Sequence, residues 1–290
     1  MEKTKQNAIK SAKPHISASL PFTKMHGLGN DYIYIDCFDA QTAALIAKTD
    51  LSALARRVSD RHYGIGSDGL VLILPSVEAD AKMRIFNADG SEAQMCGNAI
   101  RCVGKYLYEN GRHTTPHMFI ETKAGIRSLT LNIAEGVVRT VMVNMGLPHV
   151  RPDVLMRGMD PVGFISVNMG NPHAVFFRDA LRPEEVTLYG PRISTHAHFP
   201  EGTNVEFAYV RNATELDVRV YERGSGETLA CGTGACAAAV AAMQQGLTER
   251  IVTVHLPGGD LRIRWESEDE PVFMTGPATE VFKGTYFPEE

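Results

Sequence analysis

Two cysteines, Cys96 and Cys231, stand in matched surroundings 135 positions apart (231 − 96). Residues 87–98 read NADGSEAQMCGN, and residues 222–233 read ERGSGETLACGT. In both segments a strand-like run enters a Gly/Ser turn, a glutamate precedes the cysteine by four residues, and Cys-Gly opens a helical stretch. The unpaired amides and positive dipole end of a helix N-terminus stabilise a thiolate. Both cysteines are therefore candidates for acid/base chemistry, and the glycine after each lets a ligand approach the backbone.

Two opposed thiols, one ionised and one protonated, suit inversion at a carbon that bears a proton. One thiol removes the proton from one face, and the other delivers a proton to the opposite face. The same helix N-termini can hold a carboxylate and stabilise negative charge that develops on it. The pair thus predicts an amino-acid epimerase that needs no metal or other cofactor. The other three cysteines, Cys37, Cys102 and Cys236, lie at a strand end or inside helices, and we expect them in the core.

The elements that must position the two thiols follow from apolar periodicity. Helices are predicted at residues 50–58, 97–110 and 232–245; the last is alanine-rich all round, as in a helix crowded on every side. Strands are predicted at residues 31–38, 70–74, 82–86, 118–121, 128–133 and 137–142 in the first half, and at 163–167, 174–177, 205–210, 215–221, 251–255, 261–265 and 272–276 in the second.

The repeated Cys-Gly unit predicts an α+β chain of two similar domains related by a pseudo-twofold axis. Their boundary is expected between Val141 and Gly146, and the two cysteine helices would face each other across the cleft between them. We expect the first domain to comprise residues 21–142 together with 277–288, and the second to comprise residues 143–276.

The composition excludes several classes of protein. The 290 residues are 44% hydrophobic and 22% charged, as in ordinary soluble proteins, and no apolar run approaches the roughly 18 residues of a membrane-spanning helix. The net charge of −5 and the scattered Lys and Arg argue against nucleic acid or an anionic membrane as the main partner. Residues 1–20 lack an apolar run typical of a secretory signal. We expect this extension to be a disordered tail, with an organelle transit peptide as the alternative, and expect the protein in the reducing cytoplasm.

Other site types fit the spacing poorly. Cys96 to Cys102 and Cys231 to Cys236 do not match zinc pairs, and a Cys-x-x-Cys redox motif is absent from the sequence. Residues 64–66 and 224–226 are glycine-rich but complete neither a Walker nor a dinucleotide-binding fingerprint. We interpret these glycines as turn residues.

The motifs resemble the diaminopimelate epimerase family, from Phe22 to about Phe287. The segments that carry the resemblance are FTKMHGLGND at 22–31, the two cysteine segments, GNPH at 170–173, GTNVE at 202–206 and ER at 222–223. The resemblance implies two domains, each a mixed β-barrel-like sheet around a central helix. It also implies an isomerase of lysine biosynthesis that interconverts LL- and meso-diaminopimelate without pyridoxal phosphate or metal.

The resemblance also implies roles for particular residues. Cys96 and Cys231 would be the catalytic thiols, with His173 and Glu222 assisting proton movement. Asn30 would contact the reacting amino-acid head, whose carboxylate the backbone would hold at Gly97, Asn98, Gly232 and Thr233. The distant head would be bound by Asn87, Asn171, Asn204, Glu222 and Arg223, a set that suits a second ammonium and carboxylate. Taken singly, each asparagine also fits a turn.

One position departs from part of the family. Some members carry glutamine after the Gly-Ile-Gly-x-Asp motif, in contact with the reacting head, whereas Gly69 stands here. The alternatives are a racemase of another amino acid such as histidine, a non-catalytic amino-acid-binding module, and a thiol redox switch that could coexist with catalysis. The sequence does not set the oligomeric state, and a homodimer is one alternative.

Overall fold

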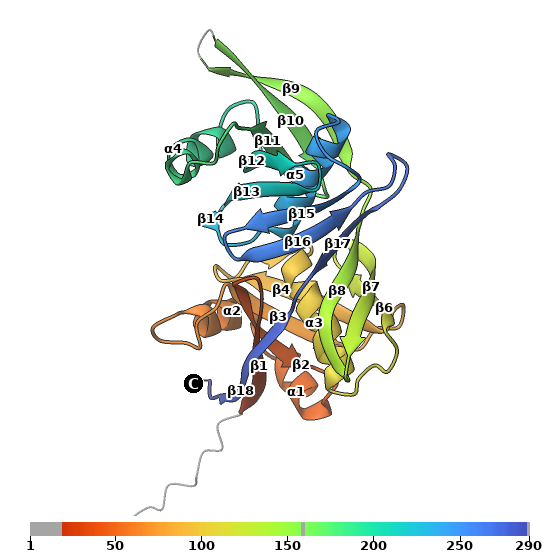
Figure 1. The fold of residues 1–290 in the computed structure, drawn as a ribbon. Coiled ribbons are helices and arrows are strands. Elements are labelled where there is room, and N and C mark those ends of the chain that lie inside the picture. Colours follow the sequence, from red (N-terminus) through yellow and green to blue (C-terminus); the bar gives the residue numbers. More distant parts are fainter. Residues whose placement is uncertain (1–18, 158–159, 289–290) are drawn as a thin grey trace, which may run out of the picture.

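The computed structural model describes residues 19–157 and 160–288. Within these ranges the chain forms five helices and 18 strands, and hydrogen-bonded pairs join all the strands into one sheet system. Figure 1 shows two lobes, one above the other, with the first half of the chain below and most of the second half above. The tail predicted at residues 1–20 lies outside the described residues except for its last two.

The lower lobe is built around a mixed sheet. Its strands are β1 (Leu20–Gly27), β2 (Asn30–Asp36), β3 (Gly69–Leu74), β4 (Ala81–Asn87), β5 (Glu92–Ala93), β6 (His117–Thr122), β7 (Gly125–Ala134) and β8 (Val137–Gly146). Helices α1 (Ala40–Ile46) and α2 (Leu51–Ser59) connect the parallel strands β2 and β3, and α3 (Gly97–Glu109) connects β5 to β6. The final strand of the chain, β18 (Thr279–Tyr286), returns to this lobe and pairs with β1.

The upper lobe repeats this arrangement. Its strands are β9 (His149–Arg157), β10 (Asp160–Asn168), β11 (Pro172–Phe177), β12 (Asn204–Asn212), β13 (Glu215–Glu222), β14 (Gly226–Thr228), β15 (Ile251–Leu256), β16 (Gly259–Arg264) and β17 (Val272–Gly276). Helix α4 (Pro183–Ser194) connects the parallel strands β11 and β12, and α5 (Gly232–Gln244) connects β14 to β15.

The strand pairings confirm the predicted pseudo-symmetry. The parallel pairs β2/β3 and β4/β6 correspond to β11/β12 and β13/β15, and the pair β18/β1 corresponds to β9/β10. Strands β8 and β17, which end the two repeats, pair antiparallel with each other and join the lobes. Because β8 pairs with both β7 and β17, the domain boundary inside residues 141–146 stays a prediction.

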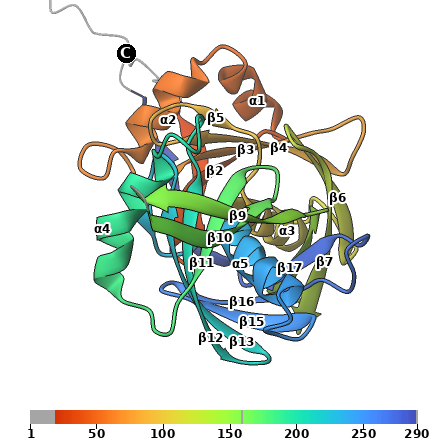
Figure 2. The same ribbon diagram turned by 90° about the horizontal axis from the view of Figure 1, so that it is seen from above.

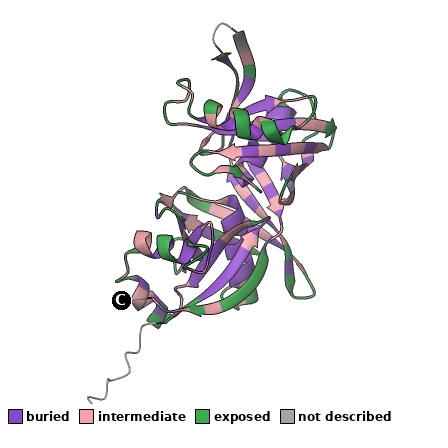
Figure 3. Cartoon of the chain, turned by 90° about the vertical axis from the view of Figure 1, so that its left-hand side faces the viewer, coloured by how far each residue is buried: buried purple, intermediate pink, exposed green. Residues whose placement is uncertain are grey.

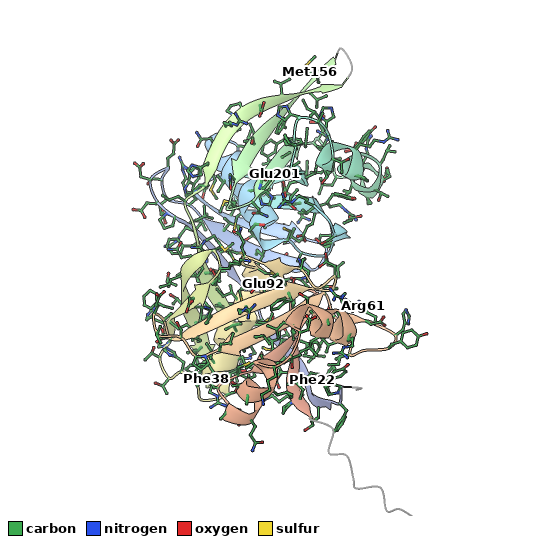
Figure 4. The ribbon with its side chains drawn as sticks, turned by 180° about the vertical axis from the view of Figure 1, so that it is seen from behind. Phe22, Phe38, Arg61, Glu92, Met156 and Glu201 are labelled. Carbon is green, nitrogen blue, oxygen red and sulfur yellow. The ribbon has the colours of Figure 1, made fainter. Side chains whose placement is uncertain are left out.

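The glutamates of the two matched segments have a structural role. Glu92 on β5 accepts a hydrogen bond from Arg84 on β4 at 2.7 Å, and Glu227 on β14 accepts one from Arg219 on β13 at 2.8 Å. Figure 4 shows Glu92 close to the junction of the lobes. Each ion pair ties the short strand before a cysteine to its neighbour, so the repeat extends from sequence to side-chain contacts.

The two cysteine helices occupy the lobe centres, as Figure 2 shows from above. Helix α3 is buried from Gly97 to Leu107, and α5 from Gly232 to Met243 except for Thr233. Figure 3 shows the buried residues concentrated inside each lobe. Alanine and glycine around α5 let strands pack against every side of the helix, which confirms the prediction from its composition.

Most predicted elements are present, and the helix at 50–58 begins after the N-cap Asp50. Helices α1 and α4 and strands β1, β5, β9, β14 and β18 were missed. Helix α4 contains Pro191, and β18 exposes Val281 and Phe282, so neither shows a clean apolar period. No helix among the described residues has both the length and the apolar character to cross a membrane.

Candidate active site

The two cysteine helices begin next to each other at the junction of the lobes. Cys96 and Cys231 are the N-cap residues of α3 and α5, and both have extended backbone conformations. A Cβ atom added to Gly97 would lie 2.8 Å from the Met274 methyl carbon, and one added to Gly232 would lie 3.1 Å from its sulfur. One methionine therefore packs against both helix starts, and a side chain at either glycine would displace the end of the Met274 side chain.

Asn98 links the two helix starts directly. Its Nδ2 donates a hydrogen bond of 2.8 Å to the carbonyl of Ala230, the residue before Cys231, and one of 3.2 Å to Oδ1 of Asn30. Its Oδ1 accepts from Nη1 of Arg101 at 3.0 Å. The sequence predicted only that the backbone of Asn98 would hold the substrate carboxylate. The structure adds a buried side chain that spans the two halves.

Cys96 is half-buried and lies beside neutral groups. Its thiol donates to Oδ1 of Asn30 at 3.5 Å, so the predicted contact residue for the reacting head touches one of the two thiols. Burial raises the pKa of Cys96, and the backbone amides of Ala99 and Asn98 oppose that shift, while the negative charge of Glu222 adds to it. The helix N-terminus thus acts on the thiol as expected, but burial outweighs it.

A charged network holds Asn30. Asp68 accepts from Nδ2 of Asn30 at 2.9 Å and from the backbone amide of Asp31 at 3.0 Å. Arg61 bridges Asp31 and Asp68, each at 2.8 Å, and Lys24 pairs with Asp31. Arg61 lies on the loop that leaves the lower lobe after α2, as Figure 4 shows. These contacts hold the Asn30 side chain in one orientation beside Cys96.

Cys231 is 5% exposed and lies among acidic groups. Its sulfur accepts a hydrogen bond from the Gly234 amide at 3.3 Å and lies 3.6 Å from the hydroxyl of Thr233. Burial raises the pKa of Cys231 well above its usual value, and the carboxylates of Glu222 and Glu206 raise it further. Two carboxylates therefore act on this thiol, whereas Glu222 is the one found to act on Cys96.

Glu222, the last residue of β13, acts on both thiols. Oε1 of Glu222 accepts a hydrogen bond from Thr228, and the Glu222 side chain also contacts Cys231. Burial raises the pKa of Glu222, and its charge in turn raises the pKa of Cys96 and of Cys231. The structure thus places this predicted residue close enough to both thiols for its charge to act on them.

His173 lies behind Cys231 in a chain of hydrogen bonds. Its Nδ1 pairs with Oε1 of Glu206 at 2.7 Å, with both side chains fully buried, and its Nε2 pairs with Oδ1 of Asn171 at 3.0 Å. Asn171 donates to the Thr233 hydroxyl at 3.4 Å. Burial raises the pKa of Glu206, and His173 opposes that shift. His173 therefore reaches the thiol through Asn171 and Thr233.

The residues expected to bind the distant head are only partly brought together. Oδ1 of Asn204 accepts from the Arg223 amide at 2.9 Å, so Asn204 shapes the turn that presents Arg223. The Arg223 side chain is exposed and donates to the Glu201 carbonyl at 2.9 Å. Asn87 lies in the other lobe, exposed at the end of β4, and donates to Ser91.

Sequence reasoning missed several neighbours of the thiols. Glu206 lies in the segment GTNVE at 202–206, and Asp68 lies in the Gly-Ile-Gly-x-Asp motif, but neither was predicted as a site residue. Both are acidic residues at the start of buried strands, a signal that could have selected them. The three remaining cysteines, Cys37, Cys102 and Cys236, are buried in the core as predicted.

A cavity of about 560 Å³ lies beside this region. Strands β9 and β10, the loop at residues 198–203 and the buried side chain of His173 contribute to its lining, whereas neither cysteine does. Among the residues that the structure describes, no group of three His, Cys, Asp or Glu side chains could hold a metal ion. The groups able to move a proton converge at the two helix starts, and we assign the candidate site there.

Comparisons with known proteins agree with this geometry. The family model described as diaminopimelate epimerase matches residues 22–150 and 165–281. The diaminopimelate epimerase of Pelotomaculum thermopropionicum is 50% identical over 279 residues, covering 91% of this chain and 98% of that protein. That of Acetivibrio thermocellus is 48% identical over 277 residues, covering 91% and 97%.

Solved structures share the fold at much lower identity. A PhzF-family phenazine biosynthesis protein of Bacillus anthracis has a TM-score of 0.69 at 16% identity, covering 93% of this chain and 99% of that one. A probable proline racemase of Agrobacterium radiobacter has a TM-score of 0.68 at 17% identity, covering 91% and 92%. With a family model that spans most of its length and relatives near half identity, the chain belongs to the diaminopimelate epimerase family.

Proposed function

We propose that this protein is an isomerase that interconverts LL- and meso-diaminopimelate by proton transfer between two cysteines at one α-carbon. The observation that carries the proposal is the pair of N-cap thiols, Cys96 and Cys231, at adjacent helix starts. One thiolate takes the α-proton and becomes a thiol, leaving a carbanion; the opposite thiol gives its proton to the other face and becomes a thiolate. Exchange of protons with solvent then returns the first cysteine to the thiolate and the second to the thiol, which restores the first state.

The helix starts would stabilise the carbanion. Its negative charge spreads onto the α-carboxylate, and the N-terminal amides of α3 and α5 are donors of the kind that bind anions. Asn30 would contact the same head, since it already lies against Cys96. Glu222 and His173 would assist by adjusting the protonation of Cys231, Glu222 by direct contact and His173 through Asn171 and Thr233.

The second amino-acid head would select the substrate. Arg223 suits its carboxylate and Glu222 its ammonium, while Asn87, Asn171 and Asn204 supply neutral donors and acceptors. A ligand without that head would not form these contacts and should bind more weakly. We further propose that the enzyme serves lysine biosynthesis in the cytoplasm, works without a cofactor, takes neither nucleic acid nor membrane as partner, and forms a homodimer.

The test is the purified protein with LL-diaminopimelate in deuterated water under reducing conditions, followed by NMR. Deuterium entering one α-carbon as the meso product appears, with no added cofactor, is the expected result. Exchange of histidine or another amino acid instead would keep the two-thiol chemistry and reject the substrate. No exchange with any amino acid would favour a binding module and reject the enzyme.

A further inference from the structure

Tyr32 lies on β2 two residues after Asn30, and therefore on the same face of the strand. Its side chain is buried, with 6% of the residue exposed. Strands β2 and β3 are parallel, and their register places Tyr32 opposite Gly69, the position where some family members carry glutamine. Tyr32 thus lies next to the position at which those family members carry the glutamine side chain.

The tyrosine ring occupies space that a side chain at position 69 would need. A Cβ atom added to Gly69 would lie 2.8 Å from Cε1 of Tyr32 and 2.1 Å from the carbonyl oxygen of Phe86. Real side chains do not approach so closely. Gly69 therefore cannot carry the glutamine on this backbone, and the Tyr32 ring fills the space where that side chain would begin.

The Tyr32 side chain lies at the reacting end of the site, on the strand face that presents Asn30. Asn30 and Cys96, which hydrogen-bond to each other at 3.5 Å, both lie close enough to the phenol to act on its pKa. Burial raises the pKa of Tyr32 well above its usual value, and the charges of Cys96, Asp68 and Glu222 raise it further. The phenol thus keeps its proton at neutral pH and can donate it in a hydrogen bond to a thiolate.

We propose that Tyr32 is a positioning residue for Cys96: its neutral phenol donates a hydrogen bond to the Cys96 thiolate and takes the place left open by Gly69. Its part in turnover rests on the function proposed above, whereas its effect on the thiol does not. A hydrogen bond to a charged group is stronger than one between neutral groups, so the contact favours the ionised thiol.

Other charged or titratable groups also face Cys96 from the elements around it. The carboxylates are those of Asp68, before β3, and Glu222, on β13. Helix α3 contributes the guanidinium of Arg101 and the thiol of Cys102, and α5 begins at the thiol of Cys231. A second phenol, Tyr34, lies on β2. The hydroxyl of Tyr34 donates to the Ala99 carbonyl at 3.4 Å. Tyr34 therefore offers a matched control: a buried phenol on the same strand whose proton is directed elsewhere.

The decisive experiment measures the ionisation of Cys96 without substrate. In a Cys231→Ala background, the rate of alkylation of Cys96 by iodoacetamide is followed against pH, with mass spectrometry assigning the site. We expect Tyr32→Phe to raise the apparent pKa of Cys96 by about one unit and to slow alkylation at neutral pH about tenfold. Tyr34→Phe should leave both unchanged. An unchanged pKa in Tyr32→Phe, or an equal change in Tyr34→Phe, would overturn the proposal.

A second measurement connects the contact to turnover. With both cysteines present, Tyr32→Phe should lower kcat about 10- to 100-fold with little change in KM, and the acid limb of kcat/KM should move to higher pH. A change in KM alone would contradict a positioning role. Because alkylation needs no substrate, failure of every variant to turn over diaminopimelate would reject the proposed function and still leave the role of Tyr32 decided.

Discussion

The two helix starts are alike in backbone and different in surroundings. Both cysteines are N-caps with extended backbones at the start of a 13-residue helix. Cys96 is half-buried beside Asn30 and Tyr32, two neutral groups. Cys231 is more buried and lies beside the carboxylates of Glu222 and Glu206.

We expect this difference to give the two thiols unequal tasks. Burial raises the pKa of both thiols; Glu222 raises it at both, and Glu206 raises it at Cys231 as well. Cys96 should therefore ionise first and act as the base in the resting site, with Cys231 as the proton donor. Because both thiols lie at helix N-termini, we expect the asymmetry to come mainly from the strand residues around them.

The largest effect is expected from removing either thiol. Cys96→Ala and Cys231→Ala should each lower epimerisation by about 10³-fold or more, because a two-base inversion needs both proton carriers. Meso product measured by NMR, with circular dichroism to show an intact fold, checks this. Near-normal turnover in either variant would reject the two-base scheme. If Cys231→Ala, which keeps Cys96, still exchanges the α-proton without inverting the carbon, and Cys96→Ala does not, Cys96 acts as the base.

Arg223→Ala should have the next largest effect. Loss of a charge-assisted contact to the distant carboxylate should lower kcat/KM for diaminopimelate about 100-fold. Arg219→Ala is the matched control, because Arg219 lies on the same stretch of chain but pairs with Glu227. Equal losses in the two variants, measured by steady-state kinetics, would argue against a substrate contact for Arg223.

Replacing Glu222 or Glu206, the two carboxylates near the thiols, should change the pKa values of the two thiols differently. Glu222→Gln removes a charge that acts on both cysteines, whereas Glu206→Gln removes one whose effect is found on Cys231. We expect Glu222→Gln to lower the pKa of both thiols and Glu206→Gln to lower mainly that of Cys231, each with about tenfold faster alkylation at fixed pH. Alkylation of each thiol with the other replaced by alanine measures this, and a lowered Cys96 pKa in Glu206→Gln alone would contradict the assignment.

The smallest effect concerns the core cysteines. Burial raises the pKa of Cys236 to about 12, so the folded state keeps this thiol protonated where the unfolded chain, with a pKa near 9, ionises. Its contribution to stability is present below about pH 9 and is lost as the pH rises toward 12. Between these values the free energy of unfolding should fall by up to about 1.4 kcal/mol per pH unit for this thiol. Urea unfolding at pH 8 and pH 10.5 should show a shallower loss in Cys236→Ala, and an unchanged loss would contradict this assignment.

Several parts of this protein follow from local sequence alone. The cysteine helices were predictable because glycine after each cysteine and an apolar or alanine-rich run set the start and length of the helix locally. The core strands were predictable because buried strands such as β3 are continuous apolar runs. Strand β18 was not, because an edge strand that pairs only with β1 exposes most of its residues and shows no periodicity.

The sequence determined which residues can carry out the chemistry, because the repeated Cys-Gly unit and its glutamates are local features. Only the tertiary structure decided how the two thiols differ. Glu206 and Tyr32 lie 25 (231 − 206) and 64 (96 − 32) positions from the cysteines they affect, and folding brings them there. A pKa depends on burial and on charges close in space, and neither can be read from the order of residues along the chain.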